Sequence, residues 1–310
     1  MKAVICPKYG PADVLKIVEY QKPDPKEDQV LIKIYATSVT NSDLFIRSSK
    51  VNPALIIPMR LMIGILKPKN EIIGEVFAGE IEKIGTQIKR FKIGDKVYGL
   101  TGMSLGAYAD YKCMKETDSK KGCISMMPKN ISYEEATSAA YGGLLALQSL
   151  EKGLFGKREN VLVYGASGTT GTMAIQIINK MGITVTGICG NKNIDFVKSL
   201  GANKVIDYTD EKSISLLEKY DLILDAVGKN KTSKLKKYCM KSLSDDGMYV
   251  SIDDDALLLD SKRLSRITEM IEMKNIKPIN DKIFEIKDIV EAHKYVEGGH
   301  KRGNVAIRVN

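Results

Sequence analysis

The sequence predicts an α/β protein in which a β-rich N-terminal part precedes a doubly wound parallel sheet. Short strand patterns separated by turn residues fill roughly the first 125 residues. From about residue 128 onward, strand patterns alternate with helix patterns, and a glycine loop joins one strand to the next helix. This alternation is typical of a parallel sheet covered by helices. The 310 residues are enough for two domains.

The N-terminal part is expected to form short strands. Runs of apolar and β-branched residues between turn signals predict them at 30–36, 72–84, 94–99 and 106–111. The second run contains Gly74 and Gly79, and glycines inside a strand pattern allow it to bend, as in a small barrel.

The C-terminal part is expected to begin with a helix over 136–150. Ser132 and Glu135 have the spacing of a capping box ahead of it, while Gly142 and Gly143 weaken its middle. Further strands are predicted at 160–164, 183–188, 204–206, 221–225 and 247–251, and helices at 170–181, 194–200 and 264–273.

The glycine loop is the strongest functional signal in the sequence. It follows the predicted strand 160–164 and opens the next helix, and it consists of Gly165, Ala166, Ser167, Gly168, Thr169, Thr170 and Gly171. Glycines let the backbone turn tightly and approach a pyrophosphate, while the helix presents free N–H groups to that anion. In this strand–loop–helix context the pattern predicts a dinucleotide-binding site.

The end of the following strand indicates which dinucleotide binds. Folds that prefer NAD usually place a carboxylate there to accept hydrogen bonds from the ribose. Here no carboxylate precedes Asp195, and Gly190 and Asn191 leave room for a 2′-phosphate that Lys192 can pair with. We therefore expect NADPH, with NADH as the second possibility. A solvated surface lysine is the alternative interpretation of Lys192.

The charge balance fits a phosphate-bearing ligand better than a nucleic acid. Lys and Arg number 47 against 38 Asp and Glu, which gives a net charge of +9. The basic residues are scattered, Trp is absent and aromatic residues make up only 6%, so a base-stacking surface is poorly supplied. We expect a small-molecule partner and no nucleic acid.

Metal and disulfide chemistry are not indicated. His293 and His300 are the only histidines, and the five cysteines contain no C-x-x-C pair. Two histidines cannot build a multi-histidine metal site, and the cysteine pattern suggests neither a zinc ribbon nor a disulfide framework.

No segment predicts membrane insertion or secretion. The longest apolar stretch, 54–66, is interrupted by Pro58 and Arg60 and is shorter than the roughly 20 residues of a membrane helix. The N-terminus lacks the apolar core of a signal peptide. We expect a cytoplasmic protein without a membrane partner.

Motifs along the whole chain carry a family resemblance. They lie, in chain order, at 1–4, 9–11, 23–25, 30–34, 41–43, 78–85, 91–99, 106–109, 165–171, 199–208, 220–228 and 299–305. The chain resembles the medium-chain dehydrogenase/reductase superfamily, and within it the zinc-independent, quinone-oxidoreductase-like branch. The resemblance implies a GroES-like substrate domain over 1–125, an NAD(P)-binding Rossmann domain over 126–265, and a return to the substrate domain over 266–310.

The same resemblance implies hydride transfer from NAD(P)H to a quinone or an α,β-unsaturated carbonyl, in a cleft between the domains. Zinc-bearing relatives keep a cysteine where this chain has Thr40 and a histidine where it has Glu75, and they carry a cysteine cluster that is missing here. Thr40 and Glu75 are poor replacements for thiolate and imidazole. We therefore expect no zinc.

The resemblance also assigns residues. Tyr208 matches a tyrosine near the adenosine phosphate, and Val227 and Gly228 match positions that line the cofactor cleft. Asn41 matches an asparagine near the nicotinamide and substrate, where it can hydrogen-bond a carbonyl oxygen, and it is the candidate catalytic residue. For Asp43 we favour a structural role. No side chain stands out as a general acid.

Two alternatives and two further expectations remain. The chain can be an alcohol or aldehyde oxidoreductase, or a non-catalytic sensor that binds NADPH. The short segment 253–263 omits a sheet-edge strand through which relatives dimerise, so we expect a monomer or an atypical dimer. Segment 50–70 is expected to cover an apolar substrate pocket or to pack in the core, with Met59, Leu61, Met62, Ile63 and Leu66 as its apolar residues.

Overall fold

Strand β3 (Gln29–Ser38) lies in the middle of the seven-stranded sheet, which is the largest of the three sheets among the described residues. In this computed structural model, the described residues are 1–49, 60, 61, 63–154, 158–229 and 233–310. They form two compact units, the first made of Met1–Ala140, Leu259–Thr268 and Asn280–Asn310, the second of Tyr141–Leu258 and Glu269–Ile279. The sequence-based boundaries at 125/126 and 265/266 differ from these bounds, because 126–140 and 259–265 group with the first unit and 269–279 with the second.

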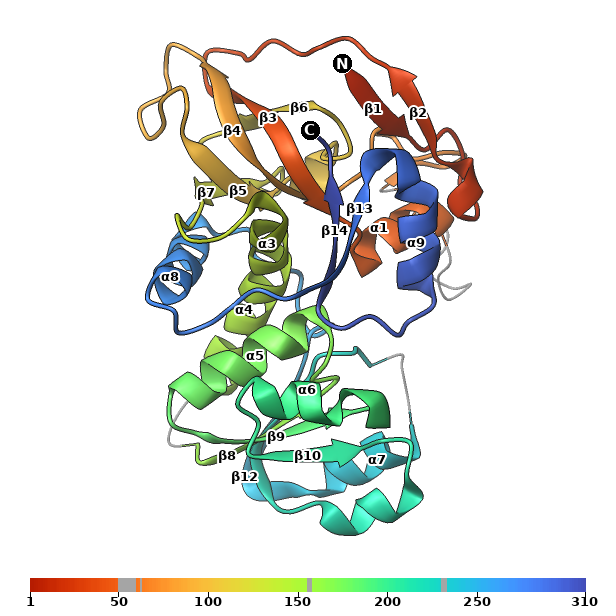
Figure 1. Cartoon of the computed structure of the whole chain (residues 1–310), viewed down its shortest axis with the longest axis vertical. Helices are drawn as coiled ribbons and strands as arrows, with labels where there is room; N and C mark the ends of the chain where they lie inside the picture. The colour runs from red at the N-terminus through yellow and green to blue at the C-terminus, as the bar shows by residue number, and fades with distance from the viewer. Residues whose placement is uncertain (50–59, 62, 155–157, 230–232) are drawn as a thin grey trace. The chain divides into compact units, whose positions relative to one another are not determined.

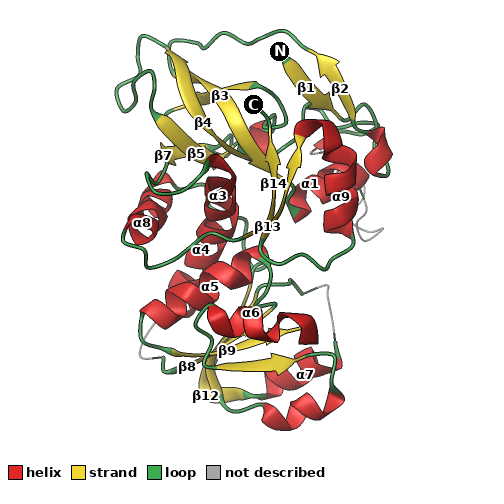
Figure 2. Cartoon of the chain, in the orientation of Figure 1, coloured by secondary structure: helices red, strands yellow, loops and turns green. Residues whose placement is uncertain are grey.

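The first unit is β-rich (Figure 2). Its large sheet has the order β13-β14-β3-β4-β5-β7, with β6 also paired to β3, and a small antiparallel sheet joins β1 to β2. The strands are β1 (Lys2–Ile5), β2 (Lys16–Glu19), β3, β4 (Val76–Ile84), β5 (Lys96–Leu100), β6 (Tyr111–Lys115), β7 (Cys123–Met126), β13 (Asn280–Glu285) and β14 (Asn304–Arg308). The helices are α1 (Asn41–Ser48), α3 (Tyr133–Ser138), α9 (Ile289–Glu297) and the first part of α8 (Ser261–Glu272).

The predicted strand at 30–36 is confirmed, because β3 buries Val30, Ile32 and Ile34 in a core shared with β4, β5 and β7. Glycine is required at position 79, where β4 pairs with β3, since a Cβ atom there would lie 2.1 Å from the Lys33 carbonyl oxygen. Close backbone approach, and not strand bending alone, explains this glycine.

The predicted strand at 106–111 is wrong over most of its length. β6 begins only at Tyr111, and Gly106 has a φ of +94°, which turns the chain before the strand starts. The backbone N–H groups of Ala107 and Tyr108 instead donate to the carbonyls of Gly74 and Ile73, at 3.0 Å each. Tertiary hydrogen bonds have replaced the expected strand pairing.

The second unit confirms the predicted doubly wound parallel sheet (Figure 1). Its order is β10-β9-β8-β11-β12, and every neighbouring pair is parallel. The strands are β8 (Asn160–Tyr164), β9 (Thr184–Cys189), β10 (Lys204–Asp207), β11 (Tyr220–Asp225) and β12 (Leu243–Ser251), and the helices are α4 (Leu144–Gly153), α5 (Thr169–Lys180), α6 (Ile194–Ser199) and α7 (Lys234–Lys241). The chain direction of strand addition reverses between β8 and β11, which is where ligands bind in such sheets.

The helix predicted over 136–150 has three parts. α3 ends at Ser138, a π-helical turn spans Ala139–Gly143, and α4 follows. Gly142 lies in this turn. A Cβ atom there would approach the Thr169 carbonyl oxygen to 2.7 Å, so the position requires glycine. In the part of the chain that the structure describes, no helix is long and apolar enough to cross a membrane.

Candidate active site

The glycine loop turns sharply between β8 and α5. Gly165 has a φ of +83°, and the N–H groups of Gly165 and Ala166 both donate to the Ile188 carbonyl of β9, at 3.0 and 2.9 Å. Gly171 packs against the loop, since a Cβ atom there would lie 2.2 Å from the Gly165 carbonyl oxygen. Gly168 is the N-cap of α5 and no side chain caps this helix end. The first backbone N–H groups of α5 therefore suit an anion such as a pyrophosphate.

The end of β9 lies beside this loop. The Asn193 amide donates to the Ser167 hydroxyl at 3.2 Å, which ties the turn after β9 to the glycine loop. A Cβ atom at Gly190 would lie 3.6 Å from the Tyr208 ring, so these two predicted cofactor positions adjoin. Asn191 and Lys192 start the turn and are exposed. The structure brings the predicted 2′-phosphate residues to one edge.

The turn after β11 reaches the same loop. A Cβ atom at Gly165 would lie 2.3 Å from the Val227 side chain, so the predicted cofactor residue Val227 packs directly on the glycine loop. The N–H groups of Val227 and Gly228 donate to one oxygen of Asp225, at 3.1 and 3.2 Å. Asp225 therefore fixes the turn that carries both predicted residues.

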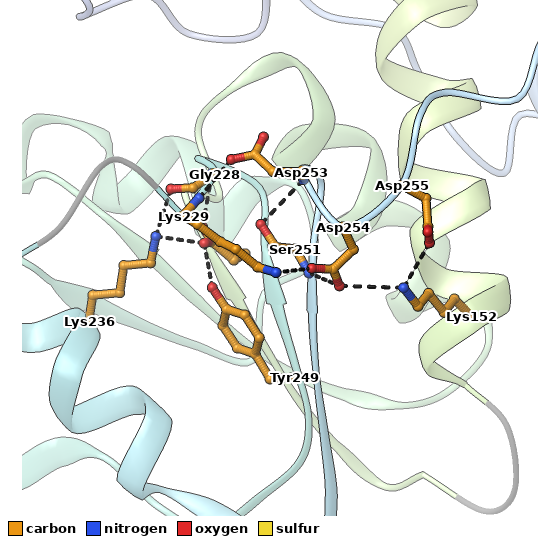
Figure 3. Close-up of polar contacts among 10 residues, drawn as sticks. Lys152, Gly228, Lys229, Lys236, Tyr249, Ser251, Asp253, Asp254 and Asp255 are labelled. Carbon is orange, nitrogen blue, oxygen red and sulfur yellow. Dashed lines mark hydrogen bonds and ion pairs between the residues drawn. The ribbon is translucent and has the colours of Figure 1, made fainter. Parts of the chain in front are cut away.

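A buried ion pair holds Asp225 in turn. Lys236 places its ammonium 2.6 Å from the Asp225 carboxylate and donates to the Gly228 carbonyl at 2.8 Å. The Tyr249 hydroxyl donates to the same carboxylate at 2.6 Å. Figure 3 shows Lys236 and Tyr249 directed toward the turn at Gly228. Burial, and then the Asp225 carboxylate, raise the pKa of Tyr249, so its hydroxyl keeps the proton that it donates.

An acidic segment extends from this turn along the start of the loop after β12 (Figure 3). Asp253 accepts from the backbone N–H of Lys229 at 2.8 Å, and Asp254 pairs with the Lys229 ammonium at 2.6 Å. Lys152 lies 2.8 Å from Asp255. Sequence reasoning missed this network. Asp225, a carboxylate at the end of a buried strand, carried a readable signal, whereas the position of Lys236 depends on how α7 packs.

In the first unit, Asn41 is the first residue of α1 and is exposed. Thr40 caps this helix: its hydroxyl accepts from the Asp43 N–H at 3.1 Å, and Asp43 accepts from the Thr40 N–H at 2.8 Å and from its hydroxyl at 2.7 Å. This is a complete capping box, and its effect is to fix the backbone at Asn41. The fully buried Asp43 therefore has a structural role at the helix start.

A second carboxyl lies next to Asp43 and was not predicted as functional. Glu75 directly precedes β4, and its side chain hydrogen-bonds Ser42 of α1. Burial, with a further contribution from Asp43, raises the pKa of Glu75 to about 8. Burial also raises the pKa of Asp43 to about 6, against the opposing hydrogen bonds from Thr40.

The predicted pocket segment is only partly visible. Met59 and Met62 lie outside the described residues. Leu61 and Leu66 are exposed, at 61% and 84% of their surface, and Ile63 is half-buried. Leu61 and Leu66 thus do not pack in the core.

Three family models match successive parts of the chain. The alcohol dehydrogenase GroES-like domain model matches residues 26–129, and two zinc-binding dehydrogenase models match residues 169–253 and 255–307. The first covers most of the β-rich strands, and the second covers the segment from α5 through the turn after β12.

Curated and solved proteins give the same grouping. A 2-methylene-furan-3-one reductase of Solanum lycopersicum is 29% identical over 99% of this chain and 79% of its own length. A chloroplastic NADPH-dependent alkenal/one oxidoreductase of Arabidopsis thaliana is 29% identical with the same coverage. The structure of the quinone oxidoreductase from Coxiella burnetii superposes with a TM-score of 0.83 at 24% identity, over 100% of this chain and 99% of that one, which shows a shared fold. With its GroES-like and dehydrogenase regions in the family's order, the chain belongs to the medium-chain dehydrogenase/reductase superfamily.

Proposed function

We propose that this chain is an NADPH-dependent oxidoreductase that transfers hydride to a quinone or an α,β-unsaturated carbonyl without zinc. The observation that carries the proposal is the glycine loop at the β8–α5 junction, with the turn after β9 packed beside it and no carboxylate at the strand end. The names of the curated relatives, which include alkenal/one and furanone reductases, support the same substrate class.

The residues present fit a dinucleotide phosphate. Gly171 lets α5 pack closely on the loop, and the N-terminal end of α5 supplies backbone donors for the pyrophosphate. Asn191 and Lys192 supply a donor and a positive charge for a 2′-phosphate, and Tyr208 flanks them with a 46% exposed ring. When bound, NADPH supplies the hydride.

In the first unit, Asn41 would hydrogen-bond the substrate carbonyl oxygen. Its amide group is exposed at a backbone position that the Thr40–Asp43 capping box fixes. A preorganised donor of this kind stabilises the negative charge that grows on the oxygen as hydride arrives. This role is compatible with both quinones and unsaturated carbonyls.

The donor set argues against the alcohol or aldehyde oxidoreductase alternative. Thr40 uses its hydroxyl in the helix cap, and a neutral Glu75 carboxyl is a weak ligand for zinc. Among the described residues, no group of three or more His, Cys, Asp and Glu is arranged to hold a metal. Without a Lewis acid, an acceptor that is already electrophilic is the better substrate.

A turnover assay tests the proposal against both alternatives. We expect steady NADPH consumption when duroquinone or crotonaldehyde is added to the purified protein, and little with butanal, which lacks the conjugated alkene. Consumption with butanal alone would favour an alcohol or aldehyde oxidoreductase. NADPH binding without consumption on any acceptor would favour the sensor.

The proposed partners are a small electrophilic substrate and no nucleic acid. We also propose a monomer or an atypical dimer, since β12 pairs only with β11 in the described part of the sheet and carries exposed Asp245 and Asp246, which discourage edge pairing. Light scattering would give 34.3 kDa for the monomer. The cytoplasmic location stays a prediction.

A further inference from the structure

Two carboxyl groups share a buried site in the first unit. Glu75 Oε2 and Asp43 Oδ1 are both shielded from solvent and meet no hydrogen-bond partner among the described residues. Glu75 as a whole residue is partly exposed. A buried carboxyl oxygen without a partner is costly to keep, because a polar group removed from water normally has its hydrogen bonds replaced. Such groups gather at sites where chemistry uses them.

Among the described residues, burial and Asp43 raise the pKa of Glu75, and no cation opposes them. Arg47 of α1 directs its guanidinium to the Gly10 carbonyl and to Glu297. His293 of α9 is uncharged, because burial, and then Arg47, lower its pKa to about 3. The Tyr108 hydroxyl lies 3.1 Å from His293 Nε2 and 3.3 Å from the Ser38 carbonyl oxygen.

Asp43 is therefore the group that bears the negative charge of the pair. Its Oδ2 atom accepts hydrogen bonds from the Thr40 N–H at 2.8 Å and from the Thr40 hydroxyl at 2.7 Å. The hydrogen bond to Ser42 lowers the pKa of Glu75. The adjacent charge of Asp43 raises that pKa and so disfavours ionisation of Glu75. Two neighbouring carboxyls with different environments divide into one base and one acid. Glu75 is the acid at neutral pH.

We propose that Glu75 is the proton donor when this chain reduces an α,β-unsaturated carbonyl. The inference rests on the proposed function. Glu75 hydrogen-bonds Ser42, which follows Asn41 in α1, and Asn41 is the residue proposed to hold the carbonyl oxygen. Sequence reasoning found no general acid, because a glutamate is an acid at neutral pH only in an environment such as this one.

The step balances as follows. Bound NADPH would supply a hydride to the β-carbon, where a C–H bond would form as the C=C π bond breaks and its electron pair moves toward the carbonyl. The Glu75 carboxyl then gives its proton to the α-carbon. NADPH is oxidised to NADP⁺, the alkene is reduced, and the Glu75 carboxylate regains a proton from water.

Quinones do not need this donor. Hydride transfer to a quinone places negative charge on oxygen, and water protonates an oxyanion rapidly. Protonation of carbon is slower and benefits from a positioned acid. Loss of Glu75 should therefore separate the two substrate classes, which a merely structural role would not do.

The test compares Glu75→Gln with wild type on crotonaldehyde and duroquinone, with Glu80→Gln of β4 as a matched control. We expect kcat with crotonaldehyde to fall at least about 100-fold in Glu75→Gln, while kcat with duroquinone and the affinity for NADPH change little. Unchanged crotonaldehyde turnover, or an equal loss on both acceptors, would overturn the assignment.

The wild-type protein gives a second readout that needs no variant. The acid form of Glu75 is lost as pH rises through about 8, so kcat with crotonaldehyde should fall above that pH while kcat with duroquinone does not. A parallel pH dependence on both acceptors would contradict the proposal. Failure of the proposed function looks different: the wild-type protein would then consume no NADPH with either acceptor at any pH.

Discussion

The ammonium of Lys236 lies 2.6 Å from the carboxylate of Asp225, and both side chains are almost completely withdrawn from solvent. The pair links α7 to the end of β11, directly before the turn that carries Val227 and Gly228. Because Asp225 also accepts from the N–H groups of Val227 and Gly228, the pair determines where that turn lies. Loss of this buried pair should therefore lower the free energy of unfolding more than loss of an exposed ion pair nearby.

Removal of the buried ammonium should be strongly destabilising. Lys236→Met leaves Asp225 buried without its cation, and we expect the free energy of unfolding to fall by about 3–5 kcal/mol. Lys229→Met breaks the exposed pair with Asp254 and should cost under about 1 kcal/mol. Urea unfolding of the two variants measures the difference, and equal losses would contradict this account of Asp225.

The two glycines that flank the first turn of α5 should differ sharply in what they tolerate. Gly171→Ala forces a Cβ atom to within 2.2 Å of a backbone oxygen, and we expect it to cost at least about 2 kcal/mol and to weaken NADPH binding. At Gly168 the nearest atom is 3.4 Å away and the φ of −81° suits alanine, so Gly168→Ala should stay within about 1 kcal/mol. Thermal unfolding and NADPH titration of both variants measure the effects on stability and on NADPH affinity. A loss of stability in Gly171→Ala as small as that in Gly168→Ala would refute the close packing.

Lys192 should distinguish the two nicotinamide cofactors. If it pairs with the 2′-phosphate, Lys192→Ala should weaken NADPH binding about tenfold or more and leave NADH binding unchanged, because a charged hydrogen bond contributes about 1.5–3 kcal/mol. Fluorescence titration of wild type and variant with each cofactor measures both effects. Equal or tighter NADH binding by the wild type would refute the preference for NADPH.

The pH dependence of stability should report the buried Glu75. Its pKa rises from 4.5 in an ordinary setting to about 8 in the folded chain, so the folded state holds this proton more tightly than the unfolded state. The associated stability is complete below pH 4.5 and is lost as pH rises through about 8. Glu75→Gln cannot ionise, so its unfolding free energy relative to wild type should increase over this range, by up to about 1.4 kcal/mol per pH unit.

Urea unfolding of wild type and Glu75→Gln at several pH values between about 5 and 9 measures that difference. A difference for Glu75→Gln that stays constant with pH would contradict the raised pKa of Glu75.

The sequence was sufficient for elements whose pattern is local. β8 matches the predicted 160–164, and β11 begins one residue before the predicted 221–225, because continuous apolar runs between polar residues identify buried parallel strands. The capping box at Ser132 and Glu135 is also present as predicted. These signals depend only on residues that are close in the chain, so the sequence is enough to predict them.

Other features depend on residues far apart in the chain. The loop before β6 follows the backbone of Gly74 and Ile73, and no local pattern reports those hydrogen bonds. Lys236 meets Asp225 only after α7 packs on the sheet. Glu75 reads as an ordinary charged residue until α1 and Asp43 bury it. The sequence alone identifies the glycine loop as a candidate cofactor site, whereas the candidate acid required the tertiary structure.

The most direct test of the central claim follows the hydride itself. The protein is incubated with crotonaldehyde and with NADPH in which deuterium replaces both hydrogens of the reactive nicotinamide carbon. The product is then analysed by mass spectrometry and NMR. We predict butanal with one deuterium at the β-carbon and none at the α-carbon, formed in step with NADPH consumption. NADPH consumption without deuterium in the product, or no consumption with any acceptor, would contradict the assignment of this chain as a reductase.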